Sequence, residues 1–571
     1  MASATRRLHV VLIVVAIGLS LCAGRLLQLQ GFDSSSYPAD ALLRTLPLLP
    51  ARGQITDRNG LVLASTQPAV AVTADPTLVA GKAAEVAEVL STHLQMPTAD
   101  LMPLLTRSGT HFVYIKKKVP ALTYSALAAD LSQRKIYGIF REPDPVRSYP
   151  NGSVGSSVVG FVGDDGQGLA GLELKFNTAM AGVEGEQTFE SAPNGSRIPL
   201  GNSSIKPAKN GVSYQLTLDS EVQWAAERRL AEQVRLTGAE SGFAIVMDPK
   251  TGQVLALANA PGFDPAKPGA SDPEDRGNRA VSAPYEPGSV EKVLTAAALV
   301  DSGTATPETR VKVPVQLATG GRYITDSFDH GVLRLNLRGV IARSSNMGTA
   351  LLARQLPEQQ LHDYLVRFGL GSRTGIELPG ESSGIVTPVA KMRPGQRDQV
   401  AFGQALAVTG IQEAAAISGL INQGVYHPPT VIKGATDADG SEVAIERRPP
   451  RRVISPESSA MVRDLMAAVI DSENGQRHLK LDDYTTGGKT GTAQRADTEC
   501  HCYRGYVTSF IGFAPLDDPR LLTYVVISNP KRGDTGTGTA APVYKDLMTF
   551  ALPRYSVQPD ARPYKPKPTE W

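Results

Sequence analysis

The sequence feature that most constrains this chain is one apolar run near its start. Residues 10–29 are predominantly apolar, and a membrane-spanning helix needs roughly 20 such residues. Arg6 and Arg7 precede the run, and basic residues favour the cytoplasmic side of a membrane. The sequence therefore predicts a cytoplasmic tail at 1–9, a transmembrane anchor at 10–29, and a long remainder outside the membrane.

Two other interpretations of the apolar run were weighed against an anchor. A secretory signal peptide would be removed, but no clear small-residue cleavage site follows the run. A lipoprotein would carry its lipid on Cys22, but Leu21 stands where that signal needs a small residue. We therefore predict an uncleaved, single-pass anchor with the N-terminus inside and the rest of the chain outside the cytoplasm.

The length of the chain, 571 residues, exceeds what one hydrophobic core supports, so two or more domains are expected. A polar linker is predicted at 30–49. Residues 50–205 mix β-branched runs, such as Val70–Thr73, with helical stretches, such as Ala84–Leu94, which indicates an α+β module. Residues 553–571 are rich in proline and charge and are expected to form an extended or disordered tail.

Residues 212–552, which follow a polar turn segment, form a second predicted domain. Ser220–Val234 has a helical pattern. The apolar runs Phe243–Met247 and Gln253–Leu257 are separated by a turn sequence, so they predict a β-hairpin. More strand-like sequence recurs near 505–530, with helical segments between. This order predicts an antiparallel sheet covered by helices, and an α+β fold class overall.

Charge and short motifs argue against nucleic-acid and nucleotide binding. The formal net charge is only +2, and Lys116–Lys118 is the longest basic run. Gly166–Gly171 matches GxGxxG, but no repeated βαβ units surround it. Gly488–Thr490 resembles the end of a P-loop, but Asp483 stands where its first glycine belongs. We predict neither nucleic acid nor nucleotide as a ligand.

The cysteine and histidine content argues against a metal site. The chain has three cysteines, and Cys500-His501-Cys502 offers at most three ligands crowded into three residues. A closed structural zinc site needs four ligands, usually from two separated pairs. Either a local disulfide or two free thiols is the better interpretation of this segment. No metal and no cofactor are predicted.

The segment Ser289-Val290-Glu291-Lys292 follows a Pro-Gly turn and precedes an apolar, alanine-rich stretch. Ser289 is therefore expected to open a buried helix, and a spacing of three residues places Lys292 beside it on one face. A neutral amine in that position can take the proton of the hydroxyl, and burial favours a neutral lysine. The helix N-terminus adds positive potential where an oxyanion would form.

A second candidate element is Ser344-Ser345-Asn346, which follows the helical stretch Leu337–Arg343 and supplies a hydroxyl and an amide two residues apart. A similar Ser-x-Asn spacing exists at Ser472–Asn474. The pattern is short, so alone it is weak evidence.

The third element is Lys489-Thr490-Gly491-Thr492, which precedes the strand-like run Val507–Phe513. Lys489 and the two hydroxyls form a suitable pocket for a carboxylate. Gly491 in a strand permits close approach of another backbone or a ligand. The element therefore predicts an anion-binding strand.

The joint occurrence of the three elements carries more weight than any one of them. The SxxK pattern also occurs at Ser132–Lys135 and Ser203–Lys206, where no catalytic context follows. The elements at Ser289, Ser344 and Lys489 stand in the order and structural context typical of serine β-lactamases and penicillin-binding proteins.

Further segments extend this similarity, and over nearly its whole length the chain resembles a class B penicillin-binding protein. The segments are Arg52–Gly60, Arg147–Pro150, Gly171–Glu173 and 402–424. The resemblance implies one membrane helix, an α+β pedestal module of the dimerisation type, and a penicillin-binding transpeptidase domain with the β-lactamase-like sheet. Two features depart from the family pattern: Glu291, where an apolar residue is usual, and the Cys500–Cys502 loop.

The resemblance also implies a role for each matching residue. Ser289 is the acylated nucleophile, Lys292 its general base, and Ser344 a proton relay to the leaving group. Asn346 binds the substrate amide, while Lys489 polarises the Ser344 region and favours a neutral Lys292. The remaining substrate-binding residues are Thr490, Gly491 and Thr492, and the backbone N–H groups of Ser289 and Thr492 form the oxyanion hole.

By resemblance, the chain is expected to be anchored in the bacterial cytoplasmic membrane and to cross-link peptidoglycan stem peptides outside it. It is also expected to be acylated by β-lactams and to serve septal wall synthesis. Ala74-Asp75-Pro76 adds to the septal resemblance. The expected partners are a polytopic SEDS-family glycosyltransferase and other division proteins. The alternatives are an elongation- or sporulation-type paralogue, a D,D-carboxypeptidase or β-lactamase, and a non-catalytic scaffold.

Overall fold

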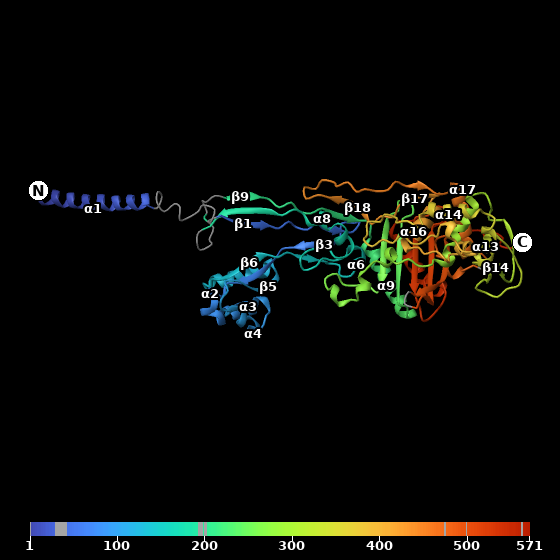
Figure 1. Ribbon diagram of the computed structural model, residues 1–571, viewed down its shortest axis with the longest axis horizontal. Coiled ribbons are helices and arrows are strands. Elements are labelled where there is room, and N and C mark those ends of the chain that lie inside the picture. Colours follow the sequence, from blue (N-terminus) through green and yellow to red (C-terminus); the bar gives the residue numbers. More distant parts are fainter. Residues whose placement is uncertain are drawn as a thin grey trace. The chain divides into compact units, whose positions relative to one another are not determined.

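The computed structural model describes residues 2–28, 43–191, 198, 203–472, 475–497, 500–560 and 564–571. By its internal contacts the chain divides into two compact units. Unit 1 comprises Met1–Ala51 and Gly182–Asn210, and unit 2 comprises Arg52–Ala181 and Gly211–Trp571. Figure 1 shows the helices and strands of both units along the sequence.

Unit 1 contains the apolar helix and a small antiparallel sheet. Helix α1 (Ala2–Leu27) includes a segment, Arg6–Leu27, that is long and apolar enough to cross a membrane. The sheet has the order β1-β8-β9, with β1 (Leu43–Leu48), β8 (Gly185–Glu190) and β9 (Ser203–Lys206). The sequence analysis placed Leu43–Leu48 in a linker. The segment is a strand because it pairs with β8, which is distant in the sequence; residues 29–42 lie outside the described part.

A small α+β lobe of unit 2 has its own core. Its sheet has the order β5-β4-β6, with β4 (Ala69–Ala74), β5 (Val113–Pro120) and β6 (Ile139–Pro143). The helices of this lobe are α2 (Pro76–Val79), α3 (Ala83–Leu94), α4 (Thr98–Leu105) and α5 (Ala121–Gln133). All six residues of β4 are buried because the strand lies between two others. The predicted strand at 70–73 and helix at 84–94 are confirmed.

A second sheet of unit 2 joins segments from distant parts of the sequence. Its order is β18-β10-β2-β3-β7. The strands are β2 (Ile55–Thr56), β3 (Val62–Gln67), β7 (Val146–Ser148), β10 (Ser213–Leu216) and β18 (Ile432–Thr436). Strand β2 pairs with β10 in parallel. The two domains predicted from the sequence therefore share hydrogen-bonded strands.

The largest region of unit 2 is built on a five-stranded antiparallel sheet of order β12-β11-β22-β21-β20. Its strands are β11 (Ser241–Met247), β12 (Val254–Ala260), β20 (Gly487–Asp497), β21 (Cys502–Ala514) and β22 (Leu521–Ser528). The predicted hairpin is confirmed as β11–β12. Strand β20 is at one edge of the sheet, so part of its backbone has no strand partner within the part of the chain that the structure describes.

Helices cover both faces of this sheet. Alternate residues of β11 point to opposite faces: Ala244 and Val246 join the core with α9 (Ser220–Thr237) and α19 (Ala541–Arg554). Phe243 and Ile245 join the core with α11 (Lys292–Asp301), α16 (Gly410–Ile421) and α17 (Pro456–Asp471). The predicted helix-covered antiparallel sheet is confirmed. Helix α9 begins after Asp219, which caps two backbone N–H groups, and ends at Gly238 in the left-handed conformation.

The remaining elements of unit 2 are short. The helices are α6 (Ser156–Val159), α7 (Gly171–Lys175), α8 (Asn177–Ala181), α10 (Arg279–Ser282), α12 (Leu337–Ala342), α13 (Asn346–Ala353), α14 (Glu358–Phe368), α15 (Gln396–Ala401) and α18 (Gly536–Thr539). The strands are β13 (Arg310–Val313), β14 (Leu317–Thr319), β15 (Arg322–Ile324), β16 (Leu333–Asn336), β17 (Val425–Tyr426) and β19 (Arg451–Arg452).

Three of the segments that carried the family resemblance meet at a buried ion-pair cluster. Arg52 Nε lies 2.6 Å from Glu173 Oε2, and Arg147 Nε lies 2.7 Å from Glu173 Oε1. The Glu173 side chain is fully buried. Arg52 also donates to the carbonyl oxygen of Glu173 at 2.8 Å. Arg52 and Glu173 are 121 residues apart in the sequence. Their ion pair, with that of Arg147, holds together the segment before β2, strand β7 and helix α7.

The C-terminal segment differs in part from the prediction of an extended or disordered tail beginning at residue 553. Helix α19 continues to Arg554. The last described segment, 564–571, is extended but bound to unit 2. The hydroxyl of Tyr564 donates to Asp464 at 3.0 Å, and the indole of Trp571 donates to the Leu335 carbonyl at 3.0 Å. These contacts hold the segment against unit 2. They could not be predicted from the sequence, because the partner residues lie far away in the chain.

Candidate active site

The turn that carries Ser289 lies against strand β20. Ser289 is half-buried in a short 3₁₀ turn, Gly288–Val290, and helix α11 begins only at Lys292. The sequence pattern predicts instead that Ser289 opens the α-helix itself. Gly288 has φ +58°, and a Cβ there would lie 2.6 Å from the carbonyl oxygen of Thr492. Glycine is therefore needed for the turn to approach the strand so closely.

Lys292 is fully buried and points into the Ser344–Asn346 turn. Its Nζ donates to the carbonyl oxygen of Ser344 at 2.5 Å, to Asn346 Oδ1 at 2.7 Å and to Ser344 Oγ at 3.2 Å. An ammonium has three protons to donate, so these acceptors match its full capacity. The structure thus brings the first and second predicted elements together.

The Ser344–Asn346 turn connects α12 to α13 and has an unusual backbone. Ser344 has φ +58°, a left-handed conformation that is uncommon for a residue with a side chain. Ser345 is buried and accepts a hydrogen bond from Gly348 N, so it caps α13. Asn346 Nδ2 donates to the Thr325 carbonyl at 3.0 Å. The backbone thus presents Ser344 and Asn346 to the lysine while Ser345 faces inward.

Strand β20 brings the third predicted element to the same place. Lys489 is fully buried, and its Nζ donates to Ser344 Oγ at 2.9 Å and to the Thr490 carbonyl at 2.9 Å. Thr490 is half-buried and Thr492 exposed. A Cβ at Gly491 would lie 2.2 Å from Ser509 Oγ and 2.9 Å from Val290 Cγ2. Gly491 therefore permits close packing of the nucleophile turn and strand β21 against β20.

The predicted residues line one cleft of about 640 Å³ in unit 2, a size that suits a small ligand. Its lining includes Ser289, Ser344, Asn346, Thr490 and Thr492. Lys292 and Lys489 are buried beneath the cleft. The Nζ atoms of both lysines donate hydrogen bonds to Ser344 Oγ. A separate cavity of about 710 Å³ contains none of these residues.

The two lysines are both buried and share one hydroxyl acceptor, and both have lowered pKa values. Burial lowers the pKa of Lys292 to about 7, against the opposing effect of the Asp326 carboxylate. Burial, and after it the charge of Lys292, lowers the pKa of Lys489 well below its ordinary value. The sequence analysis expected a charged Lys489 to favour a neutral Lys292. In the structure the charge effect acts in the opposite direction, from Lys292 on Lys489. Two like charges this close hold one positive charge more readily than two.

Comparison with known proteins identifies the family. Residues 242–549 match the penicillin binding protein transpeptidase domain, and residues 47–216 match the penicillin-binding protein dimerisation domain. The chain belongs to the penicillin-binding protein transpeptidase family. The serine transpeptidase class and the class B resemblance inferred from the motifs are thereby confirmed.

Individual relatives cover almost the whole of this penicillin-binding protein. It is 33% identical to stage V sporulation protein D of Bacillus subtilis, over 93% of this chain and 82% of that protein. It is 30% identical to the probable peptidoglycan D,D-transpeptidase PenA of Neisseria meningitidis, over 97% and 93%. The crystal structure of penicillin binding protein 3 from Mycobacterium tuberculosis with aztreonam superposes with TM-score 0.71 at 29% identity, over 90% and 98%.

The departure at Glu291 leads to a feature that the sequence analysis missed. Glu291 does not line the cleft, and it is fully buried together with Glu413 of α16. Burial raises the pKa of Glu291 well above its ordinary value and that of Glu413 to about 8. Both carboxyl groups are therefore neutral at pH 7. Beside them, the hydroxyls of Tyr285 and Tyr524 lie 2.5 Å apart.

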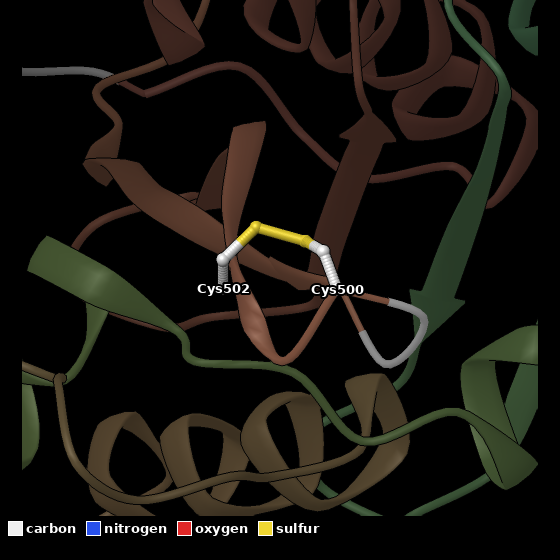
Figure 2. Close-up of a disulfide and its surroundings, with 2 residues drawn as sticks. All are labelled: Cys500 and Cys502. Carbon is white, nitrogen blue, oxygen red and sulfur yellow. A yellow bond between two sulfur atoms is a disulfide. The ribbon is translucent and has the colours of Figure 1, made fainter.

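The cysteine loop of this penicillin-binding protein contains a disulfide between Cys500 and Cys502 (Figure 2). Of the two alternatives left open, disulfide or free thiols, the structure has the disulfide. The neighbouring Tyr503 donates a hydrogen bond to Glu286 Oε1 at 3.1 Å. Glu286 also accepts from Ala405 N at 2.9 Å, so the loop contacts the segment that precedes the nucleophile.

Sequence analysis also missed two residues that hold the Ser344–Asn346 turn, Asp326 and His330. The buried carboxylate of Asp326 accepts hydrogen bonds from Ser345 Oγ at 2.6 Å and from Met347 N at 3.0 Å. His330 Nε2 lies 3.1 Å from the same carboxylate. The only local signal was an Asp and a His four residues apart in a polar loop, which is too common to be specific.

Proposed function

We propose that this penicillin-binding protein is a serine D,D-transpeptidase that cross-links peptidoglycan stem peptides, with Ser289 as the nucleophile and Lys292 as the base. The observation that carries the proposal is the convergence of two buried lysines on Ser344 Oγ, beneath a cleft that Ser289 lines. Buried amines with lowered pKa values at a cleft are characteristic of catalytic sites.

In the first step, Ser289 Oγ attacks the carbonyl carbon of the penultimate D-Ala, and its proton passes to neutral Lys292. The N–H groups of Ser289 and Thr492 stabilise the oxyanion. The C–N bond then breaks, and the leaving amine of the terminal D-Ala receives a proton from Lys292 through Ser344. This relay is supported by the positions of both lysines, which lie 3.2 and 2.9 Å from Ser344 Oγ.

In the second step, the amine of a neighbouring stem peptide attacks the acyl-enzyme ester. Its proton returns through Lys292 to Ser289 Oγ as the C–O bond breaks, and a new amide remains. β-Lactams undergo the first step alone because their acyl-enzyme persists. The reaction needs no cofactor.

Substrate binding uses the edge position of strand β20. An extended peptide can pair with the free backbone groups of an edge strand. Thr490 and Thr492 bind the terminal carboxylate beside Gly491, and the charge of Lys489 attracts it. A bound carboxylate also favours a protonated Lys489, which leaves Lys292 as the neutral member of the pair. Asn346 Oδ1 has a second lone pair for the substrate amide.

The test of this function separates aminolysis from hydrolysis and from a non-catalytic scaffold. The full-length protein is incubated with a stem pentapeptide and an added D-amino acid, and the products are measured by mass spectrometry. A transpeptidase exchanges the terminal D-Ala for the added amino acid. A carboxypeptidase also releases the terminal D-Ala, but it transfers the acyl group to water. Ser289→Ala should abolish both the exchange and labelling by fluorescent penicillin. Labelling of Ser289→Ala at the wild-type rate contradicts the assignment.

We also propose that α1 is an uncleaved anchor in the bacterial cytoplasmic membrane, with the N-terminus inside and the catalytic region outside. The apolar helical segment Arg6–Leu27, with the basic residues Arg6 and Arg7 at its start, supports this. The organisation that we propose for the chain is a single anchor at 10–29, a pedestal at 50–205 and a transpeptidase domain at 212–552. N-terminal sequencing of the mature protein tests it, and a start beyond residue 22 contradicts an anchor.

The cellular role that we propose is septal wall synthesis together with a polytopic SEDS-family glycosyltransferase and other division proteins. The sequence resemblance to the septal class supports this role. Depletion in growing cells distinguishes the alternatives: filaments indicate a division role, rounded cells an elongation role, and a defect confined to spores a sporulation role. Co-purification with the glycosyltransferase from detergent-solubilised membranes tests the partner, and its absence from a stable preparation contradicts it.

A further inference from the structure

The loop after strand β15 contains a buried Asp–His pair that belongs to none of the predicted motifs. The Asp326 side chain is fully buried, and that of His330 is 6% exposed. Asp326 Oδ2 accepts from Ser345 Oγ at 2.6 Å and from His330 Nε2 at 3.1 Å, while Oδ1 accepts from Met347 N at 3.0 Å. The carboxylate therefore holds the middle and the end of the Ser344–Asn346 turn.

Both ring nitrogens of His330 face hydrogen-bond acceptors. Nδ1 lies 2.5 Å from the carbonyl oxygen of Gly331, and Nε2 faces the Asp326 carboxylate. Both neighbours are acceptors, and a neutral imidazole has only one N–H to donate. The doubly protonated imidazolium satisfies both contacts. In that form His330 places a positive charge directly against Asp326.

Asp326 is linked to the base through the turn that it holds. Ser344 and Asn346, on either side of Ser345, accept the hydrogen bonds of Lys292 Nζ. The charge of Asp326 opposes the effect of burial and raises the pKa of Lys292. An unbalanced carboxylate here would therefore keep Lys292 protonated and unable to accept a proton from Ser289.

We propose that Asp326 and His330 are positioning residues that set the charge state of Lys292: the carboxylate orients the turn, and the imidazolium offsets its negative charge so that Lys292 becomes neutral. The proposal rests on the proposed role of Lys292 as the base. It assigns the pair no contact with the substrate.

Other charged groups around Lys292 do not replace this pair. Lys489 carries the same sign as Lys292, and burial keeps the carboxyl groups of Glu291 and Glu413 neutral at pH 7. Several charged residues on or next to the elements packed around α11 form ion pairs of their own. These pairs are Arg354–Asp398, Arg338–Asp464, Arg343–Glu570 and Lys480–Asp471.

The test uses two substitutions whose effects should have opposite signs. Asp326→Asn removes the negative charge, so the pH at which acylation reaches half its maximum should fall. His330→Gln leaves Asp326 unbalanced, so this midpoint should rise. Each midpoint should shift by about one pH unit, which is the order of effect that a nearby charge has on a pKa. The full-length protein is treated with fluorescent penicillin, and the rate constant of acylation is measured at pH values from about 5.5 to about 9.5. This is about the range in which Lys292 titrates.

The double variant and a matched control sharpen the test. If His330 acts through Asp326, adding His330→Gln to Asp326→Asn should not move the midpoint further. His111 forms a similar pair with Asp75 in the small lobe, at 3.3 Å, and His111→Gln should leave the profile unchanged. Melting temperatures establish that each variant is folded.

The proposal is overturned if both midpoints move in the same direction or neither moves, even where rates fall. If Asp326→Asn does not fold, the His330→Gln shift decides alone: a rise supports the proposal, and a fall or no change overturns it. A failure of the proposed function is distinguishable, because Lys292→Arg would then acylate at the wild-type rate whatever the two midpoints do.

Discussion

The buried charges of the Arg52–Glu173–Arg147 cluster and those of the active site are arranged in opposite ways. In the first cluster, two guanidinium groups contact one carboxylate at 2.6 and 2.7 Å. In the active site, two lysine amino groups converge on one neutral hydroxyl. Both sets are buried. The first is compensated within hydrogen-bonding distance, and the second is not.

This difference separates a structural use of buried charge from a chemical one. A compensated cluster holds distant segments together, and its charges do not need to change during function. Like charges that share an acceptor make each other easier to deprotonate, which costs stability but provides a base at neutral pH. The same residue types therefore stabilise the fold in one region and provide reactivity in the other.

The largest expected effect is on catalysis. Lys292→Arg keeps a positive charge but removes the basic lone pair, because arginine does not deprotonate in proteins. Acylation by penicillin should fall about 10²–10⁴-fold, the usual contribution of a general base. Lys489→Arg keeps part of the carboxylate attraction and should retain slower, measurable acylation. The two variants are compared by their rate constants of acylation by penicillin. If the Lys292→Arg variant is acylated as fast as the Lys489→Arg variant, or faster, Lys292 is not the base.

The second expected effect is on stability, in the compensated cluster. Glu173→Gln leaves two buried guanidinium groups without their carboxylate, and breaking a buried pair costs about 3–5 kcal/mol. The free energy of unfolding of the full chain, measured by urea denaturation, should fall accordingly, while the folded variant still acylates. Asp164→Asn is the control, because its ion pair with Lys118 is exposed and should contribute nothing measurable. If both substitutions lower the free energy of unfolding equally, the buried cluster does not stabilise the fold more than an exposed ion pair does.

The third expected effect is a pH-dependent gain in stability on removal of a catalytic lysine. The folded pKa of Lys292, about 7, lies below the ordinary value, 10.5. Folding at pH 7 therefore requires loss of a proton that the unfolded chain keeps, and this cost diminishes as the pH rises toward 10.5. Lys292→Met should be more stable than the wild type at pH 7, and its advantage should shrink by about 2 kcal/mol at pH 9. A constant difference across this range would mean that Lys292 titrates normally.

The smallest expected effect is in the cysteine loop. The disulfide closes a segment with a sequence separation of only 2, so it restricts the unfolded chain little. The double variant Cys500→Ser, Cys502→Ser should acylate at the wild-type rate and melt close to the wild type. Loss of acylation would instead place the loop, through Tyr503 and Glu286, in the support of the nucleophile turn.

Elements with a local pattern were predictable from the sequence. The period of apolar residues gave α9, α3 and the β11–β12 hairpin, because those patterns reflect burial of one face or of whole strands. The order and spacing of the motifs at 289, 344 and 489 indicated the chemistry of the site. Its residues converge as expected, although the sequence could not show that Lys489 is as deeply buried as Lys292.

Contacts between distant residues were decided only by the tertiary structure. Arg52, Arg147 and Glu173 had no visible connection until folding placed them in one cluster. The same holds for strand β1, for the bound C-terminal segment, and for the Asp326–His330 pair beneath the catalytic turn. A hydrogen bond or ion pair across tens of residues leaves no periodicity in the sequence, because each partner is locally only a polar residue. The sequence by itself determined which groups carry the chemistry, and the tertiary structure determined which charges surround them and so how readily they lose a proton.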